Sequence, residues 1–106
     1  MAKGDVVSNI TDVAAAASLI YQPAAGVEVL ITEVGSSGWT GPTPDKTPYV
    51  TVRLNNGTSI SVLKLFNEST TWSKELKAFI TNSVYLDLYN PHTGTASIGY
   101  CGIQIK

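Results

Sequence analysis

The residues best suited to covalent chemistry are a single cysteine and a single histidine, Cys101 and His92. A cysteine nucleophile needs a base that generates its thiolate, and histidine is a common partner. If the segments on either side of His92 pair as a hairpin, the two side chains approach each other only at the turn. The alternation around Cys101 places its thiol on an inward face. We therefore interpret Cys101 as a small buried hydrophobe and His92 as a solvated loop residue.

Other catalytic or ligand-binding arrangements lack their characteristic spacing. The serines lie outside any nucleophile-elbow motif, and Gly35-Ser36-Ser37-Gly38 lacks the lysine and helix of a phosphate-binding loop. The carboxylates do not have zinc or EF-hand spacing, because the aspartates are separated along the chain at Asp5, Asp12, Asp45 and Asp87. We predict no catalytic residue, no cofactor, no metal site and no enzyme activity.

Charge is sparse along the 106 residues, which suffice for one domain. Charged residues make up 14% and hydrophobic residues 43%, with a formal net charge of −1. This balance argues against intrinsic disorder and is typical of a β-rich, assembly-prone protein. The seven Lys and Arg residues are scattered, so the chain lacks the basic patch that nucleic-acid binding requires.

Targeting signals are also missing from the sequence. No apolar run approaches the roughly 18 residues of a membrane span, and no signal-peptide core follows the first residues. A single cysteine excludes an intrachain disulfide. We expect synthesis in a reducing cytoplasm and no membrane partner.

Period-2 alternation of apolar residues predicts a set of short strands with one wet face. The inward-facing residues expected from this alternation are Val50, Val52 and Leu54; Ile60 and Val62; Val84, Leu86 and Leu88; and Cys101, Ile103 and Ile105. A further strand is expected at 27–32. The apolar phase slips within 59–66, where Leu63 and Leu65 take over, and this predicts either a β-bulge or a strand that faces two environments.

Turn residues separate these strands. Asn55-Asn56-Gly57 predicts a type I′ hairpin, and turns are expected at 22–26 and 90–94. A long loop stiffened by prolines is expected over 35–48, carrying an exposed Trp39.

Two segments are ambiguous between helix and strand. Four alanines at 14–17 favour helix intrinsically, but the run is short and precedes β-prone residues, so extended structure is preferred there. Residues 71–77 are expected to form one helical turn that carries Trp72.

The fold prediction is an all-β, single antiparallel β-sandwich of about seven to eight strands, with either jelly-roll or immunoglobulin-like topology. Residues 14–106 form the sandwich domain, and residues 1–13 form an N-terminal arm outside it. Such arms are ordered when a partner holds them.

Exposed aromatic residues and the arm supply the candidate binding positions. Five aromatic residues fall in loops or on outward positions, which suits a second buried face, a protein interface or sugar stacking: Trp39, Tyr49, Trp72, Tyr85 and Tyr89. The candidate partner-binding residues are Lys3, Val6, Val7, Ile10, Trp39, Trp72, Tyr85 and Tyr89.

Three strand-and-turn phrases carry a resemblance to known proteins: QPAAGVEVLI at 22–31, FITNSVYL at 79–86 and IGYCGIQI at 98–105. Over roughly residues 16–106 the chain resembles small β-sandwich virion proteins of tailed bacteriophages, a group that includes capsid decoration (cement) proteins and head domains of fibres and tail appendages. The resemblance implies a homo-oligomer, commonly a trimer, attached to a capsid or tail, without enzyme activity or cofactor.

The function expected from this resemblance is that of a capsid decoration protein. It would bind the major capsid protein or another virion protein on the outer capsid surface and stabilise the shell. The alternative is a tail-fibre or appendage module that recognises a host surface glycan through Trp39 and its loop, or through Tyr85 and Tyr89. A small host-directed enzyme or inhibitor is a third possibility.

Overall fold

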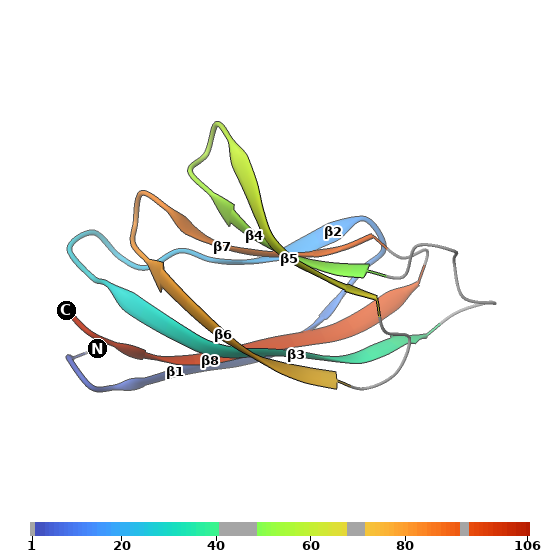
Figure 1. Ribbon diagram of the computed structural model, residues 1–106, viewed down its shortest axis with the longest axis horizontal. Coiled ribbons are helices and arrows are strands. Elements are labelled where there is room, and N and C mark those ends of the chain that lie inside the picture. The colour runs from blue at the N-terminus through green and yellow to red at the C-terminus, as the bar shows by residue number, and fades with distance from the viewer. Residues whose placement is uncertain (1, 41–48, 68–71, 92–93) are drawn as a thin grey trace.

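The computed structural model describes residues 2–40, 49–67, 72–91 and 94–106, and within them eight strands and no helix. The strands are β1 (Val6–Val13), β2 (Ala17–Tyr21), β3 (Val29–Thr40), β4 (Tyr49–Asn55), β5 (Ile60–Asn67), β6 (Trp72–Ile80), β7 (Tyr85–Asn90) and β8 (Thr95–Gln104). They form two sheets, one over the other (Figure 1). Over the described residues no helix is long and apolar enough to cross a membrane.

The strand order shows how the chain is wound. Sheet A has the order β1-β8-β3-β6 and sheet B the order β2-β7-β4-β5, and all neighbours are antiparallel. The first strand pairs with the last, the second with the seventh, the third with the sixth and the fourth with the fifth. The strands are therefore paired as in one long antiparallel hairpin that is wrapped into two sheets, which is the jelly-roll topology. The predicted all-β sandwich is confirmed, and of its two expected topologies the structure has the jelly roll.

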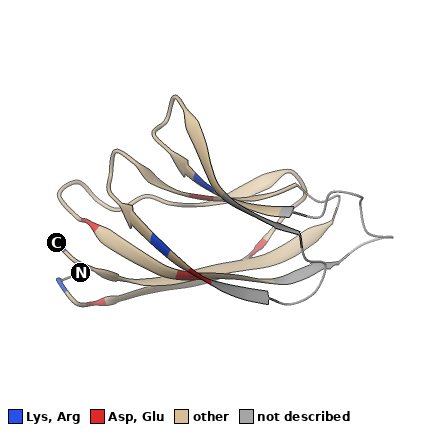
Figure 2. Ribbon diagram, in the orientation of Figure 1, with Lys and Arg blue, Asp and Glu red and all other residues tan. Residues whose placement is uncertain are grey.

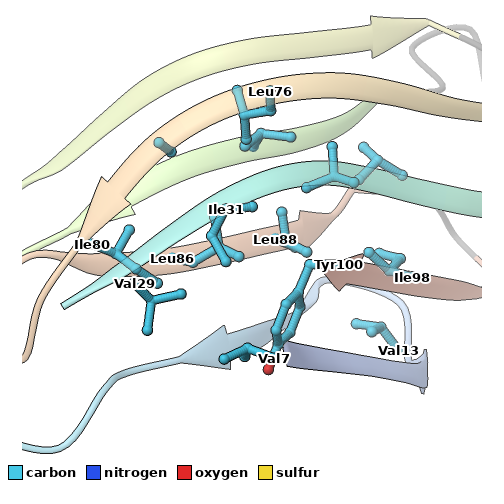
Figure 3. Packing of buried hydrophobic residues seen from close by; sticks show 14 of the residues in the cluster. Val7, Val13, Val29, Ile31, Leu76, Ile80, Leu86, Leu88, Ile98 and Tyr100 are labelled. Atoms are coloured by element: carbon cyan, nitrogen blue, oxygen red, sulfur yellow. The ribbon is translucent and has the colours of Figure 1, made fainter. Parts of the chain in front are cut away.

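Branched aliphatic residues from both sheets fill the core between them (Figure 3). Val29 and Ile31 of β3 are fully buried against Leu86 and Leu88 of β7, with Ile80 beside them. Alternate residues of each strand point inward because successive side chains of a strand face opposite sides of its sheet. The same alternation sends the remaining residues to the two outer faces.

Asn90 holds the corner where the chain passes from sheet A to sheet B. Its side chain is fully buried, and Nδ2 donates to the carbonyl oxygens of Val13 and Gly94 at 2.9 Å and of Ala14 at 3.3 Å. The backbone N–H of Ala16 donates to the Asn90 carbonyl at 2.9 Å, and Ala16 adopts a φ of 58° in this turn. The Asn90 side chain thus satisfies backbone groups of the β1–β2 and β7–β8 connections.

Two stacked tyrosines fill the core near strands β1 and β2. The rings of Tyr21 and Tyr100 lie 5.0 Å apart at 16° to each other. The Tyr21 hydroxyl is buried without a hydrogen-bond partner among the described residues. Burial raises the pKa of Tyr21 above its usual value of 10.0. The pKa of Tyr100 is raised by burial and by neighbouring Tyr21, against a lowering hydrogen bond from Asn9.

The structure differs from the sequence prediction at the N-terminus. Residues 6–13, expected in an arm outside the sandwich, form strand β1, which pairs with β8 over its whole length. The pairing is favoured because Val7 and Val13 reach the core from this strand. Residues 71–77 were expected as a helical turn, but 72–77 belong to β6, where Leu76, Ala78 and Ile80 alternate inward. Extended structure was preferred for 14–17, but residues 15–16 form a turn and only residue 17 is extended, as the first residue of β2.

The predicted phase of β8 is wrong. Ala96, Ile98, Tyr100 and Gln104 are buried, whereas Ile103 is 40% exposed and Cys101 half-buried on the other face. Apolar residues stand on both faces of this strand, so alternation alone did not decide its orientation. Gly102 belongs to the inner set, where an added Cβ would collide with the Leu30 carbonyl oxygen of β3.

Of the predictions for residues 59–66, one is confirmed and one is wrong. The bulge in 59–66 is confirmed: Val52 pairs with Lys64 and Arg53 with Val62, which leaves Leu63 without an opposite residue. The expected inward orientation of Ile60 and Val62 is wrong, because they are 51% and 53% exposed.

The two connections flanking β4 also differ from expectation. The β4–β5 turn is not type I′, since Gly57 has a positive φ and Asn56 does not; the Asn56 side chain instead accepts from the N–H groups of Thr58 and Ser59. The long loop expected over 35–48 begins later, because residues 35–40 continue β3 beside β8. Residues 41–48 lie outside the described part.

Asn90→Ala should lower the free energy of unfolding by about 2–3 kcal/mol, because several buried carbonyls lose their donor at once. Asn82→Ala is the matched control: among the described residues its Nδ2 donates only to the Pro23 carbonyl, at 3.0 Å, so we expect a loss of about 1 kcal/mol. Urea denaturation followed by circular dichroism measures both. Equal losses in the two variants would contradict the role assigned to Asn90.

Tyr21→Phe should raise the free energy of unfolding by about 0.5–1 kcal/mol near pH 7, because it removes a buried hydroxyl without a partner. In the wild type the unfolded state loses the tyrosine protons first as pH rises above about 10, so stability falls there; the variant should lose less. Denaturation midpoints between about pH 9 and 12 measure this. Tyr85→Phe, on the outer face of sheet B, is the control, and an equal pH dependence in all three proteins would argue against the effect.

Candidate protein-binding surface

A row of four apolar side chains crosses the outer face of sheet A. Val6 pairs with Ile103, Ile103 with Leu30, and Leu30 with Phe79, so one residue comes from each strand. Val6 is 73%, Ile103 40% and Phe79 67% exposed. Directly opposed side chains on one face of a sheet lie in contact distance, so these residues form one continuous strip, here called the apolar row.

The neighbouring rows of the same face differ in character. Ser8, Cys101, Glu33 and Glu75 form a polar row next to the apolar row. In the row after that, Ile10, 73% exposed, lies beside Gly99 and Gly35. Because the glycines carry no side chains, the surface is hollowed there, and a recess of about 350 Å³ is lined in part by Ile10, Gly35, Gly99 and Cys101.

Charged residues are few and dispersed over the described parts of both sheets (Figure 2). On the outer face of sheet A, Glu33, Glu75 and Lys77 surround a shallow groove beside Leu30. The face therefore combines an uncharged strip with a thin polar border, which is the usual anatomy of a protein-binding surface.

The outer face of sheet B carries an ionic cluster. Nη2 of Arg53 donates to both carboxylate oxygens of Asp87, at 3.0 and 3.1 Å, and to Ser18 Oγ at 3.2 Å. Asn55 Nδ2 also donates to Asp87 at 3.1 Å. The Arg53 guanidinium lies 4.5 Å from the ring centre of Tyr89.

This cluster is better suited to holding strands together than to binding a ligand. The Asp87 side chain is only 3% exposed and already accepts from two neighbours, and Arg53 covers one face of the Tyr89 ring. Its members come from β2, β4 and β7, so it joins three strands of one sheet. The exposed apolar residues of sheet B lie on its two edge strands, with Ile60, Val62 and Leu63 on β5 and Ile20 on β2.

The structure separates the candidate residues into two groups. Val6 and Ile10 lie on the outer face of sheet A, and exposed Lys3 lies in the turn that precedes β1. Tyr85 and Tyr89 are half-buried on the outer face of sheet B, away from that surface. Val7 is 7% exposed and belongs to the core, so it is not a surface residue. The side chains of Trp39 and Trp72 lie outside the described part.

Sequence reasoning missed Leu30, Phe79 and Ile103. Phe79 lies between Ala78 and Ile80, both inward, so the alternation of β6 was the signal that it faces outward. Ile103 was assigned to the wrong face together with Cys101. In the parts of the chain that the structure describes, no three His, Cys, Asp or Glu residues are grouped to hold a metal ion.

Comparison with known proteins identifies the fold. No family model matches the chain, and no curated protein has a similar sequence. Among solved structures the chain is similar to the Drosophila NLP core, a structure described for its pentamer formation and histone binding, with a TM-score of 0.51 and 12% identity over 93% of this chain and 98% of that chain. At this identity the similarity shows a shared fold alone.

Arg53→Met should lower the free energy of unfolding by about 2–3 kcal/mol, because it leaves the buried Asp87 carboxylate without its cation. The double variant Arg53→Met, Asp87→Leu should recover most of that loss, since an apolar pair can replace a buried ion pair at little cost. Chemical denaturation measures both, with exposed Lys77→Met as a near-neutral control. A single variant as stable as the control would show that the cluster contributes little.

Proposed function

We propose that the protein is a structural subunit without enzyme activity, which binds a protein lattice through the outer face of sheet A. The observation that carries this proposal is the apolar row, which crosses all four strands of sheet A with exposed Val6, Ile103 and Phe79 and half-buried Leu30. Contiguous exposed apolar side chains rimmed by polar residues mark surfaces that bind other proteins. The exposed apolar residues of sheet B are a weaker candidate, because the Arg53–Asp87 pair separates Ile20 on β2 from Val62 on β5.

The lattice we propose is the outer surface of a virus capsid, on the resemblance of the sequence phrases to decoration proteins of tailed phages. The jelly roll is also a fold of viral capsid domains. Binding to assembled shells and not to free subunits stabilises the shell by mass action, and many copies add up small contributions. Apolar contacts suit this task because salt screens them little.

Two other functions have less support. Glycan recognition through Tyr85 and Tyr89 needs open aromatic faces, and Arg53 covers one face of Tyr89. Histone binding, which the NLP core suggests, involves a strongly basic partner. This chain has eight acidic against seven basic residues, so its charge does not favour such a partner.

Phe79→Lys should reduce occupancy on virus particles by at least tenfold, because a charge replaces an apolar side chain at the contact. The particles are purified from the source of this chain, stripped of the native protein and refilled, and occupancy is measured by quantitative mass spectrometry. Ile60→Lys, an equally drastic change on β5, should bind as the wild type does. Absence of the protein from washed native particles, or equal occupancy of both variants, would refute the proposal.

A further inference from the structure

Strand β1 is an edge strand that lacks the usual protection against pairing. Within the described residues it pairs only with β8, in an unbroken register over eight residues, and Asp12 is its one charged residue. Exposed edges present unpaired N–H and C=O groups, which template pairing with another chain. Natural sheets block them with charges, bulges, prolines or short strands.

The other three edges of the sandwich carry such devices. Edge strand β6 has exposed Glu75 and Lys77. Edge strand β5 is bulged at Leu63, and edge strand β2 has only five residues. The contrast marks β1 as the edge that remains available for pairing.

From this contrast we infer that β1 pairs antiparallel with β1 of a second copy, which joins two A sheets into one continuous sheet. Along an antiparallel pair of strands, hydrogen-bonded and non-hydrogen-bonded residue pairs alternate. A two-fold axis can relate only pairs of the same kind, so it must pass between one residue and the same residue of the second copy. The register is therefore fixed by the choice of the central residue.

When the two-fold axis passes through an Ile10–Ile10 pair, the opposed residues of the two β1 strands are of similar polarity. Ile10, 73% exposed, meets Ile10 of the second copy, and Val7 meets Val13 on the inner face. The polar residues then pair with each other, Asn9 with Thr11 and Ser8 with Asp12. Shifting the centre to Asn9 would instead place Asp12 opposite Val6 and Ile10 opposite Ser8, so the sequence of β1 favours Ile10.

The two-fold axis of such a dimer stands perpendicular to the sheet, so both apolar rows face the same side. A two-fold contact is isologous and replaces the trimer implied by the sequence resemblance. A dimer that binds one lattice through both apolar rows gains avidity, and this step rests on the proposed function. The dimer itself does not rest on the proposed function.

Disulfide trapping tests the register in a Cys101→Ser background, which removes the native thiol. Ile10→Cys should give a covalent dimer under mild oxidation, because opposed residues of an antiparallel pair lie within disulfide reach, with Cα atoms about 4.5–5.5 Å apart. Asn9→Cys, whose predicted partner is Thr11, should give little. Preferential trapping of Asn9→Cys would overturn the register.

Sedimentation equilibrium of the unmodified protein tests the dimer independently of trapping. Ile10→Lys should weaken dimerisation at least tenfold, whereas Ile60→Lys and Phe79→Lys should dimerise as the wild type does. A wild-type protein that is monomeric, trimeric or pentameric would overturn the inference. Phe79→Lys separates the two proposals, because it should retain the dimer and lose the lattice.

Discussion

Two open sheets cannot pair all their backbone groups within one chain, because each sheet ends in two edge strands. The rolled hairpin of this protein places β1 and β6 at the edges of sheet A and β2 and β5 at those of sheet B. Whether an edge strand is protected decides whether a strand of another chain can pair with it. Charges, a bulge and shortness protect three of them, and the long regular β1 is left as a place for another strand.

The interior follows from the same winding. Pairing the first strand with the last brings Val7 and Val13 of β1 into a core made by β3, β4, β6, β7 and β8. The corner after β1 leaves backbone carbonyls away from water, and the Asn90 amide satisfies them. An asparagine in an otherwise apolar position of β7 is therefore explained by the sheet crossing that it supports.

Much of the fold follows from period-2 patterning, but the choice of face does not. Leu86 and Leu88 alternate with polar neighbours, and their burial was predicted correctly. In β8, Ile98 and Tyr100 on one face compete with Cys101 and Ile103 on the other, so the pattern fits both orientations. Contacts between strands distant in sequence resolve the choice, among them the packing of Tyr100 on Tyr21 and the close approach of Gly102 to Leu30.

The same limit explains why the apolar row was not predicted. Its members are far apart in sequence, and they become neighbours only through the registers of β1, β8, β3 and β6. A sequence pattern shows which residues could face outward, whereas register shows which of them meet. Exposed Val6 and Ile10 were therefore found as single candidates, without the strip to which Val6 belongs.

The two outer faces of the sandwich differ, and the difference favours one of them, the outer face of sheet A, as the binding surface. Sheet B closes part of its outer face with the Arg53–Asp87 pair and with Tyr89, whose groups bind one another. Sheet A leaves an uncharged strip across its full width and an open edge beside it. A freely diffusing domain gains nothing from such a strip, which lowers its solubility, whereas a subunit that buries the strip against a neighbour gains its transfer free energy. The asymmetry of the faces is for this reason a stronger argument for assembly than the low charge of the chain.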